Sequence, residues 1–223
     1  MRVFDHNIRL TAATLLALCL SSYLYSASAH AADVRDISKI NGGIRVAANE
    51  AVGNVSSVNG GIAIRQGDSA FDVETVNGGI EIEDDVEISQ AETVNGGIRL
   101  GRDVKVNGSL NSVNGGILTG DGTVVERGIS SVNGKIRLDN TTVGEDLETV
   151  SGDIELRDGT VIEGDLIVKR NHSWLTRFFS FNRNQTSVTI DSTSSVRGDI
   201  HLYREVELRI DDGAEVGEII EHY

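Results

Sequence analysis

A five-residue phrase, an apolar residue followed by Asn-Gly-Gly-Ile or a close variant, recurs between residues 40 and 154 of this 223-residue chain. Its copies are INGGI at 40–44, VNGGI at 58–62, 76–80, 94–98 and 113–117, VNGKI at 132–136 and VSGDI at 150–154. The second residue of each copy lies 18, 18, 18, 19, 19 and 18 positions after that of the copy before. Seven copies with one residue of drift predict a solenoid, in which each repeat stacks on the next.

The spacing inside each repeat indicates strands. An apolar–x–apolar pattern follows the Gly-Gly pair, as in Ile62-x-Ile64 and Ile80-x-Ile82, and this is the alternation of a strand with one buried side. Two further apolar groups follow in each repeat: Val86, Val104, Val124, Val143 and Val161 in one, and Val55, Val73, Leu110, Ile129, Leu147 and Leu166 in the other. We therefore predict an all-β fold, a single-chain parallel β-solenoid (β-helix) of about nine coils of 18–19 residues, with ladders of Ile, Val and Leu inside.

The Asn-Gly-Gly phrase suits a sharp corner, because glycine adopts positive φ freely and asparagine tolerates it. Stacking would place the asparagines in one column, about 4.8 Å apart, where their side-chain amides can bond to one another and satisfy a buried corner. The predicted ladder comprises Asn41, Asn59, Asn77, Asn95, Asn114 and Asn133. A ligand site is the alternative, but a residue repeated in every coil favours a structural role. The same register would place Glu81 beside Arg99 and Arg137 beside Glu155 on the outside.

The repeat is interrupted after Ser151. The next expected corner is the phrase VRGDI at 196–200, so Arg197 would follow Ser151 by 46 residues, about ten more than two coils need. The extra residues fall in KRNHSWLTRFFSFNRNQTS, 169–187, which is basic and aromatic in an otherwise acidic and aromatic-poor chain. Six of its side chains are the candidate binding residues: Trp174, Arg177, Phe178, Phe179, Phe181 and Arg183.

Three interpretations of this insert remain open. The aromatic side chains could pack back on the flank of the solenoid. They could instead form a recognition loop for a protein or a glycan, since Trp, Phe and Arg are frequent in binding hot spots. The third interpretation is contact with an anionic membrane surface, through this loop alone.

Residues 1–31 are typical of a secretory signal, with Arg2 and Arg9 near the start, an apolar run at 10–20 and Ala-x-Ala sites at 27–31. We expect an exported protein, in the periplasm or at the cell surface, with the solenoid over 32–223. An uncleaved anchor and a lipoprotein anchored at Cys19 are the alternatives. Cys19 is the sole cysteine, so no disulfide or Cys-based metal site is expected in the mature chain.

The formal charge of −14 argues against nucleic acid as a partner. The sequence contains no phosphate-binding loop, dinucleotide motif, zinc spacing or catalytic triad order. We regard the acidic turn Glu83-Asp84-Asp85 as solvated in preference to a Ca²⁺ site, and His172, His201 and His222 as scattered. No metal, no cofactor and no enzymatic activity are therefore expected.

The solenoid phrases, with second-half phrases such as Gly108-Ser109-Leu110 and Gly164-Asp165-Leu166, resemble exported bacterial β-solenoid domains of the adhesin type, whose function is unknown. They are more distantly similar to bactofilins, which are cytoplasmic β-helices that polymerise end to end. The resemblance covers about residues 34–220 without the insert, and the signal segment departs from the bactofilins. It implies a scaffold or adhesin role in the cell envelope.

Three functions are therefore weighed. The favoured one is a non-enzymatic envelope scaffold or adhesin-like module that contacts a protein or glycan through 169–187. The second is a structural protein that self-assembles through its ends, since neither end carries a capping helix or a proline and open sheet edges pair readily. A glycan-active β-helix enzyme is third, and it would need carboxylates that converge on the loop.

Overall fold

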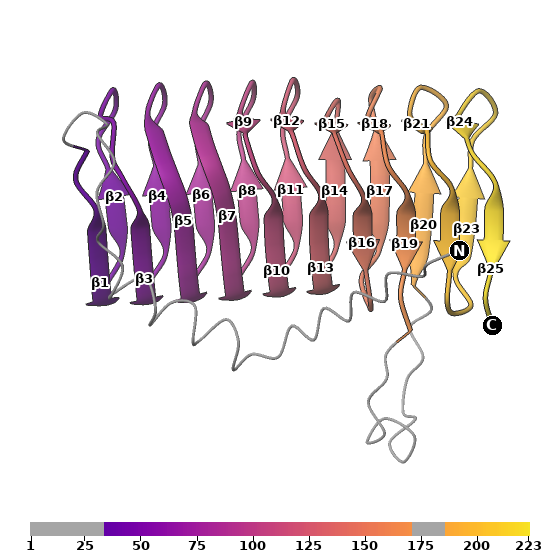
Figure 1. The fold of residues 1–223 in the computed structure, drawn as a ribbon, viewed down its shortest axis with the longest axis horizontal. Helices are drawn as coiled ribbons and strands as arrows, with labels where there is room; N and C mark the ends of the chain where they lie inside the picture. The colour runs from indigo at the N-terminus through magenta and orange to yellow at the C-terminus, as the bar shows by residue number, and fades with distance from the viewer. Residues whose placement is uncertain (1–33, 171–185) are drawn as a thin grey trace, which may run out of the picture.

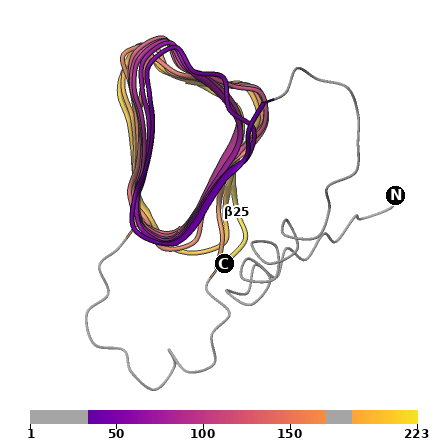
Figure 2. The same cartoon turned by 90° about the vertical axis from the view of Figure 1, so that its left-hand side faces the viewer.

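A computed structural model describes residues 34–170 and 186–223 of the chain. In this part the chain forms 25 strands and no helix, wound into a parallel β-solenoid of about nine turns. The coils lie side by side along the molecule (Figure 1), and viewed along the axis they superimpose as a closed ring (Figure 2). The predicted fold class is therefore confirmed. Within the same residues, no helix is long and apolar enough to cross a membrane.

Each coil has three faces. The first face precedes the Asn-Gly-Gly corner. Its strands are β1 (Ile37–Asn41), β3 (Val55–Asn59), β5 (Ser69–Asn77), β7 (Glu87–Asn95), β10 (Leu110–Asn114), β13 (Ile129–Asn133), β16 (Leu147–Thr149), β19 (Leu166–Val168), β22 (Ile200–Leu202) and β25 (Ile219–Glu221).

The second face follows that corner and forms a separate nine-stranded sheet. Its strands are β2 (Ile44–Val46), β4 (Ile62–Ile64), β6 (Ile80–Ile82), β8 (Ile98–Leu100), β11 (Ile117–Thr119), β14 (Ile136–Asp139), β17 (Ile154–Arg157), β20 (Ser187–Ile190) and β23 (Glu207–Ile210).

The third face carries two-residue strands in most coils. They are β9 (Lys105–Val106), β12 (Val124–Val125), β15 (Thr142–Val143), β18 (Val161–Ile162), β21 (Ser195–Val196) and β24 (Glu215–Val216). The nine-residue strands β5 and β7 run from the third face onto the first, so these two faces share one 16-stranded sheet.

Neighbouring coils pair in parallel without a slip in register. Asn41 is opposite Asn59 and Asn59 opposite Asn77, while Ile62 is opposite Ile80 on the second face. The 19-residue steps do not disturb this order, because Asn95 is still opposite Asn114. In-register pairing puts residues with the same role in columns through the molecule, which is what the repeat predicted.

The interior is a continuous apolar core of Ile, Val and Leu columns. The column that runs from Val55 through Leu110 to Leu166 is fully buried, as predicted. On the third face the prediction was one residue out in two coils: Val124 and Val161 point partly outward, and Val125 and Ile162 fill the core. Two adjacent valines or isoleucines look alike in a sequence, but a strand can point only one of them inward.

The valine before each asparagine belongs to the outside of the first face, where it forms an apolar stripe separate from the core. Val76 and Val94 are its most buried members, with Val58 and Val113 packed beside them. At the first coil the stripe ends in Ile40, which is 65% exposed. Alternation along the strand places Thr75 and Thr93, the residues before these valines, inward.

Positive φ occurs mainly at a different corner from the one predicted. Between the second and third faces, each of Asn49, Asp85, Asp103 and Asn140 has φ between 40° and 61°, and Gly67 occupies the same turn with φ of 73°. At the Asn-Gly-Gly corners only Gly42 has positive φ. Asn, Asp and Gly thus supply the left-handed backbone at the corner between the second and third faces. The presence of two glycines at most Asn-Gly-Gly corners must have another cause.

Coil pairing continues on both sides of the insert, but residues 196–200 lie at the corner between the third and first faces and not at the predicted corner between the first and second. Ile200 pairs with Leu166 on the first face, whereas the partner of Ile154 on the second face is Val188. The pairing distance of 34 residues from Ile154 to Val188 exceeds one coil by about 15, more than the ten expected. The prediction failed because the Gly-Asp-Ile phrase occurs at two different corners: at 152–154 it joins the first face to the second, and at 198–200 it joins the third face to the first.

Candidate functional site

Close approach between coils explains the first glycine of every Gly-Gly pair except Gly42, which has positive φ and would meet no atom within 4 Å. A Cβ atom at Gly78 would lie 2.3 Å from the carbonyl oxygen of Gly60, and one at Gly96 would lie 1.9 Å from that of Gly78. Real Cβ atoms do not come this near to backbone oxygen. Stacking therefore requires glycine here even though the backbone is not left-handed.

The asparagine ladder forms as predicted. Each Nδ2 donates to the Oδ1 of the asparagine one coil before, over 3.1, 3.0, 2.9, 3.0 and 3.0 Å from Asn59 to Asn133. The column is exposed, however, so it does not satisfy a buried corner as expected. Its effect is to fix the register at the surface.

Buried hydroxyl groups support the same corner from inside, which the sequence analysis missed. Thr75 Oγ1 donates to the carbonyl oxygen of Gly60 over 2.9 Å, and Thr93 Oγ1 donates to that of Gly78 over 3.0 Å. Ser112 and Ser131 repeat the contact over 3.1 and 3.2 Å. The signal was available, because Ser or Thr stands two residues before each of these asparagines.

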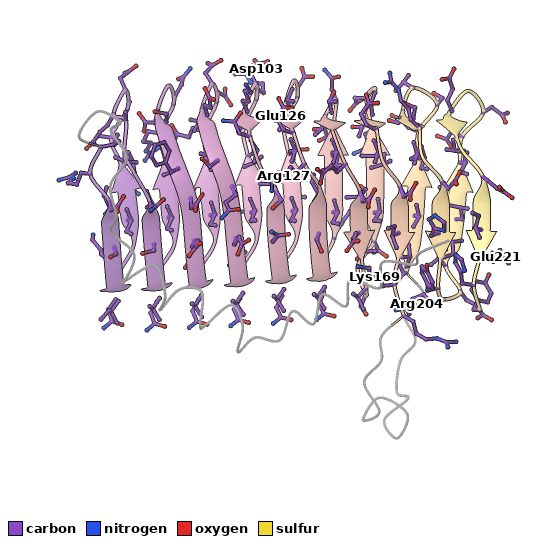
Figure 3. The ribbon with its side chains drawn as sticks, viewed as in Figure 1. Asp103, Glu126, Arg127, Lys169, Arg204 and Glu221 are labelled. Carbon is purple, nitrogen blue, oxygen red and sulfur yellow. The ribbon has the colours of Figure 1, made fainter. Side chains whose placement is uncertain are left out.

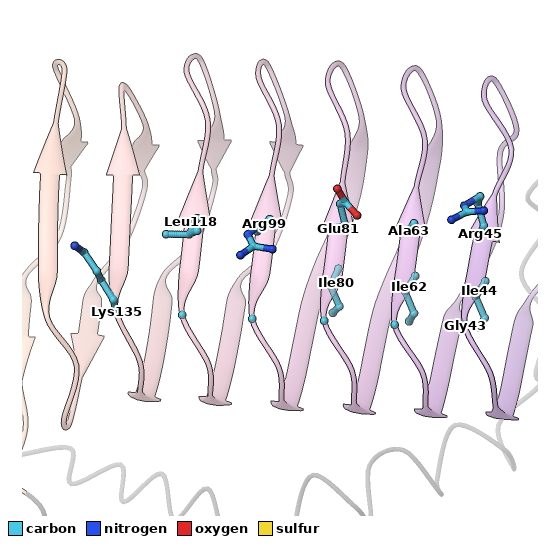
Figure 4. A pocket seen from close by; sticks show the side chains of 14 residues that line it. Gly43, Ile44, Arg45, Ile62, Ala63, Ile80, Glu81, Arg99, Leu118 and Lys135 are labelled. Atoms are coloured by element: carbon cyan, nitrogen blue, oxygen red, sulfur yellow. The ribbon is translucent and has the colours of Figure 1, made fainter.

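The second glycine of each pair opens a groove on the outside of the solenoid. Its column runs along the second face, and we call it the glycine trough: Gly43, Gly61, Gly79, Gly97, Gly116 and then Lys135. The trough has a volume of about 940 Å³ and continues across six coils, beside the outward row from β2 to β11 (Figure 4). Because five of the six positions lack side chains, backbone atoms form its floor.

The floor of the trough offers hydrogen-bond donors. Within the described residues, the amide N–H groups of Gly43, Gly61, Gly79, Gly97 and Gly116 make no hydrogen bond to the protein, although the next residue in each coil bonds to a neighbouring coil. These glycines are exposed or half-buried. These N–H groups form a column of hydrogen-bond donors with a spacing of about 4.8 Å, the spacing of stacked strands.

The charged side chains that line the trough are mostly basic. Arg45, Arg99 and Lys135 face it, against a single acid, Glu81, in a chain whose formal charge is −14. Glu81 is opposite Arg99 in register, as predicted. Within the described residues neither of the two forms an ion pair within 4 Å, so the guanidinium group of Arg99 stays available.

An ion-pair cluster closes one end of the trough. Lys135 Nζ lies 2.5 Å from Glu155 Oε1, and Arg137 Nε lies 3.7 Å from Glu155 Oε2, which confirms the second predicted pair. Arg137 Nε is also 3.6 Å from Asp139 Oδ1, and neither of these two buried atoms has a hydrogen bond. Burial raises the pKa of the Asp139 carboxyl, and the nearby Arg137 charge offsets this only in part.

The insert leaves from the corner that the asparagines occupy in other coils. All six predicted binding residues lie in 171–185, outside the described residues, so their arrangement stays a prediction. At the base, Arg204 Nη1 donates to the carbonyl oxygen of Val150 over 3.0 Å, and Lys169 Nζ lies 2.5 Å from Glu148 Oε2. Figure 3 places Lys169 and Arg204 at the same edge of the solenoid. Arg204 thus spans the coil whose corner the insert replaces.

Two histidines that looked scattered come together in the last coils. His201 Nδ1 lies 3.1 Å from His222 Nε2, and Tyr203 stacks on the His222 ring with 4.2 Å between centroids. The two histidines are close because β22 pairs with β25. Their separation of 21 residues, which differs from the repeat of 18–19, gave no sign of this in the sequence. No group of three or more metal-ligating side chains exists among the residues that the structure describes.

The acidic turn 83–85 is bound within the protein. Arg102 donates to Asp84 Oδ2 through Nη2 over 2.6 Å, and its backbone N–H donates to Asp84 Oδ1 over 2.8 Å. These bonds, the backbone one foremost, lower the pKa of Asp84. Glu83 pairs with Arg65.

Comparison with known proteins gave no match: no family model, no curated protein and no solved structure is significantly similar to this chain.

Proposed function

We propose that the protein is a non-enzymatic, exported scaffold or adhesin-like module of the cell envelope, which contacts a protein or glycan through the insert at 169–187. One observation carries the proposal: the insert replaces one corner while pairing continues on both sides of it. β17 pairs with β20, and β19 pairs with β22. An addition that leaves the core intact is typical of a binding segment displayed on a rigid scaffold.

The composition of the insert supports a role in recognition. Trp174, Phe178 and Phe179 are the kinds of residue that dominate binding hot spots, and Arg177 and Arg183 add charge of the sign that the rest of the chain lacks. The signal-like residues 1–31 support export. Contact with an anionic membrane surface through the same segment remains the alternative target.

Capture from envelope extracts tests this function. We expect Trp174→Ala and Phe178→Ala each to abolish capture of the partner and to leave the thermal midpoint nearly unchanged. Phe71→Ala is the matched control, because Phe71 is an exposed aromatic residue of the third face, 48% accessible, far from the insert in sequence. Capture that survives both insert substitutions would refute the proposal, and a large fall in midpoint would show that the aromatic residues pack on the solenoid.

The second candidate function is assembly through the solenoid ends, and an asymmetry between the ends favours it. In the last coil Leu208, Ile210 and Val216 are only partly buried, whereas Ile44 and Val46 of the first coil are 4% and 1% exposed. Among the described residues β23 and β25 pair on one side only, and strand edges beside incompletely covered apolar side chains favour pairing with another molecule. Sedimentation at high concentration and high salt, where the negative charges are screened, should then show oligomers, and a strict monomer would rule assembly out.

A further inference from the structure

We propose that the glycine trough binds a linear acidic polysaccharide. The carboxylate groups of this ligand would accept hydrogen bonds from the trough amides and form ion pairs with the guanidinium groups of Arg45 and Arg99. The trough is a site separate from the insert. Its existence does not depend on the function proposed for 169–187.

The shape of the trough selects a long, thin ligand. Six coils at about 4.8 Å give a length of about 24 Å along the solenoid axis, with an unbroken backbone floor. The strands cross this direction, so a ligand in the trough contacts one coil after another. Each coil offers the same donor, which suits a polymer of repeating units.

The spacing of the donors distinguishes between polymers. An extended peptide advances about 3.3 Å per residue and repeats a side-chain direction every second residue, which does not match the coil spacing. An extended chain of pyranose rings advances by nearly the coil spacing per ring, so one ring lies over each amide of the column. Successive rings of a 1,4-linked chain turn about the chain axis, so carboxylate and hydroxyl oxygen atoms alternate as the acceptors that face the amides. Gly61, Gly79, Gly97 and Gly116 would then serve consecutive rings.

The charges select the acidic class of polysaccharide. Unpaired N–H groups bind anions, and hydrogen bonds to a charged acceptor are about twice as strong as neutral ones. Arg45 and Arg99, three coils apart, flank the floor, and no described residue forms an ion pair with either. Ala63 and Leu118 are uncharged, apolar residues in the same outward-facing row as Arg45 and Arg99, and the apolar face of a sugar ring can pack on them.

Titration of the full-length protein with a hexameric oligouronate tests the proposal by calorimetry and by amide NMR. We expect saturable binding, with the largest amide shifts at Gly61, Gly79, Gly97 and Gly116. A neutral glucose hexamer should not bind, and a uronate dimer should bind much more weakly than the hexamer. Absence of saturable binding at low salt, or shifts elsewhere in the protein, would overturn the proposal.

Matched charge variants sharpen the test. Arg99→Gln and Arg45→Gln should each weaken binding of the hexamer about tenfold, roughly the effect of one charge-assisted hydrogen bond at a surface. Arg127→Gln changes the net charge equally at another corner (Figure 3) and should have no effect. Equal weakening by all three would show diffuse attraction, and equally tight binding of a polyphosphate chain would show that sugar is not recognised. Either result would overturn the proposal.

Trp174→Ala separates this site from the proposed function of the insert. It should abolish capture of the envelope partner and leave oligouronate affinity unchanged. Loss of both activities in this variant would place the glycan on the insert and overturn the assignment to the trough.

Discussion

The clearest prediction concerns two adjacent glycines of the third Asn-Gly-Gly phrase. A methyl group at Gly78 would lie 2.3 Å from the carbonyl oxygen of Gly60 and 2.5 Å from its carbon, whereas one at Gly79 would meet only the oxygen of Gly97, at 3.4 Å. Neither residue has positive φ. Gly78→Ala and Gly79→Ala thus add the same methyl group at neighbouring positions of one turn, and they differ in what that group contacts.

The expected magnitudes follow from these distances. Ordinary contact begins at 3.4 Å, so the coils at Gly78 must separate by about 1.1 Å, the difference from 2.3 Å. That movement disturbs the bond from Gly60 N–H to the Asn77 oxygen, now 3.0 Å. Overpacking costs about 1–3 kcal/mol and one lost hydrogen bond about 1 kcal/mol, so Gly78→Ala should lower the free energy of unfolding by about 2–4 kcal/mol. Gly79→Ala should lie between no change and a gain of about 1 kcal/mol, because alanine restricts the unfolded chain.

Urea unfolding followed by circular dichroism measures both variants against the parent protein. We expect a clear fall in the midpoint for Gly78→Ala and none for Gly79→Ala. Equal losses in the two variants would show that general loss of glycine flexibility is what matters. A Gly78→Ala protein as stable as the parent would refute the close approach of the coils.

Three further outcomes are expected. Asn95→Ala removes hydrogen bonds of 2.9 and 3.0 Å to its two ladder neighbours and should cost about 1–2 kcal/mol in urea unfolding; no loss would show that the ladder does not stabilise the fold. Leu147→Ala, at a fully buried position, should cost about 2–5 kcal/mol, and a cost below that of Asn95→Ala would contradict the assigned core. Burial raises the pKa of Asp139, so the folded protein loses stability as the pH rises above the ordinary value of 3.8 and this carboxyl must ionise. Asp139→Asn should therefore stabilise the protein at neutral pH and have no effect at about pH 3. The reverse pH dependence in urea unfolding would refute this.

The sequence predicted the stacking well because one constraint acts on every coil. An asparagine such as Asn77 lies between identical residues above and below, so repetition in the sequence directly reports a contact in space. Alternation likewise predicted the burial of Ile62 and Ile64. Such features follow from period and register alone.

The features that were missed depend on atomic detail that period does not encode. Positive φ and close approach both select glycine, so the sequence could not show that Gly78 serves the second purpose and Gly67 the first. The Gly-Asp-Ile phrase occurs at two different corners, at 152–154 and 198–200, which led to the wrong corner being expected for Ile200. The trough was not anticipated, because it depends on an absence of side chains along a column and on N–H groups that the neighbouring coils leave unpaired.

The central claim is that like residues form columns, one coil apart, and distances between spin labels measure this directly. In a Cys19→Ser background, one label at Ser56 is combined with a second at Ser130, Glu148 or Ile167, which lie four, five and six coils further along the same column. At about 4.8 Å per coil, pulsed electron paramagnetic resonance should give separations near 19, 24 and 29 Å, a straight line against coil number. Separations that do not increase by one constant step per coil would contradict the stacked solenoid.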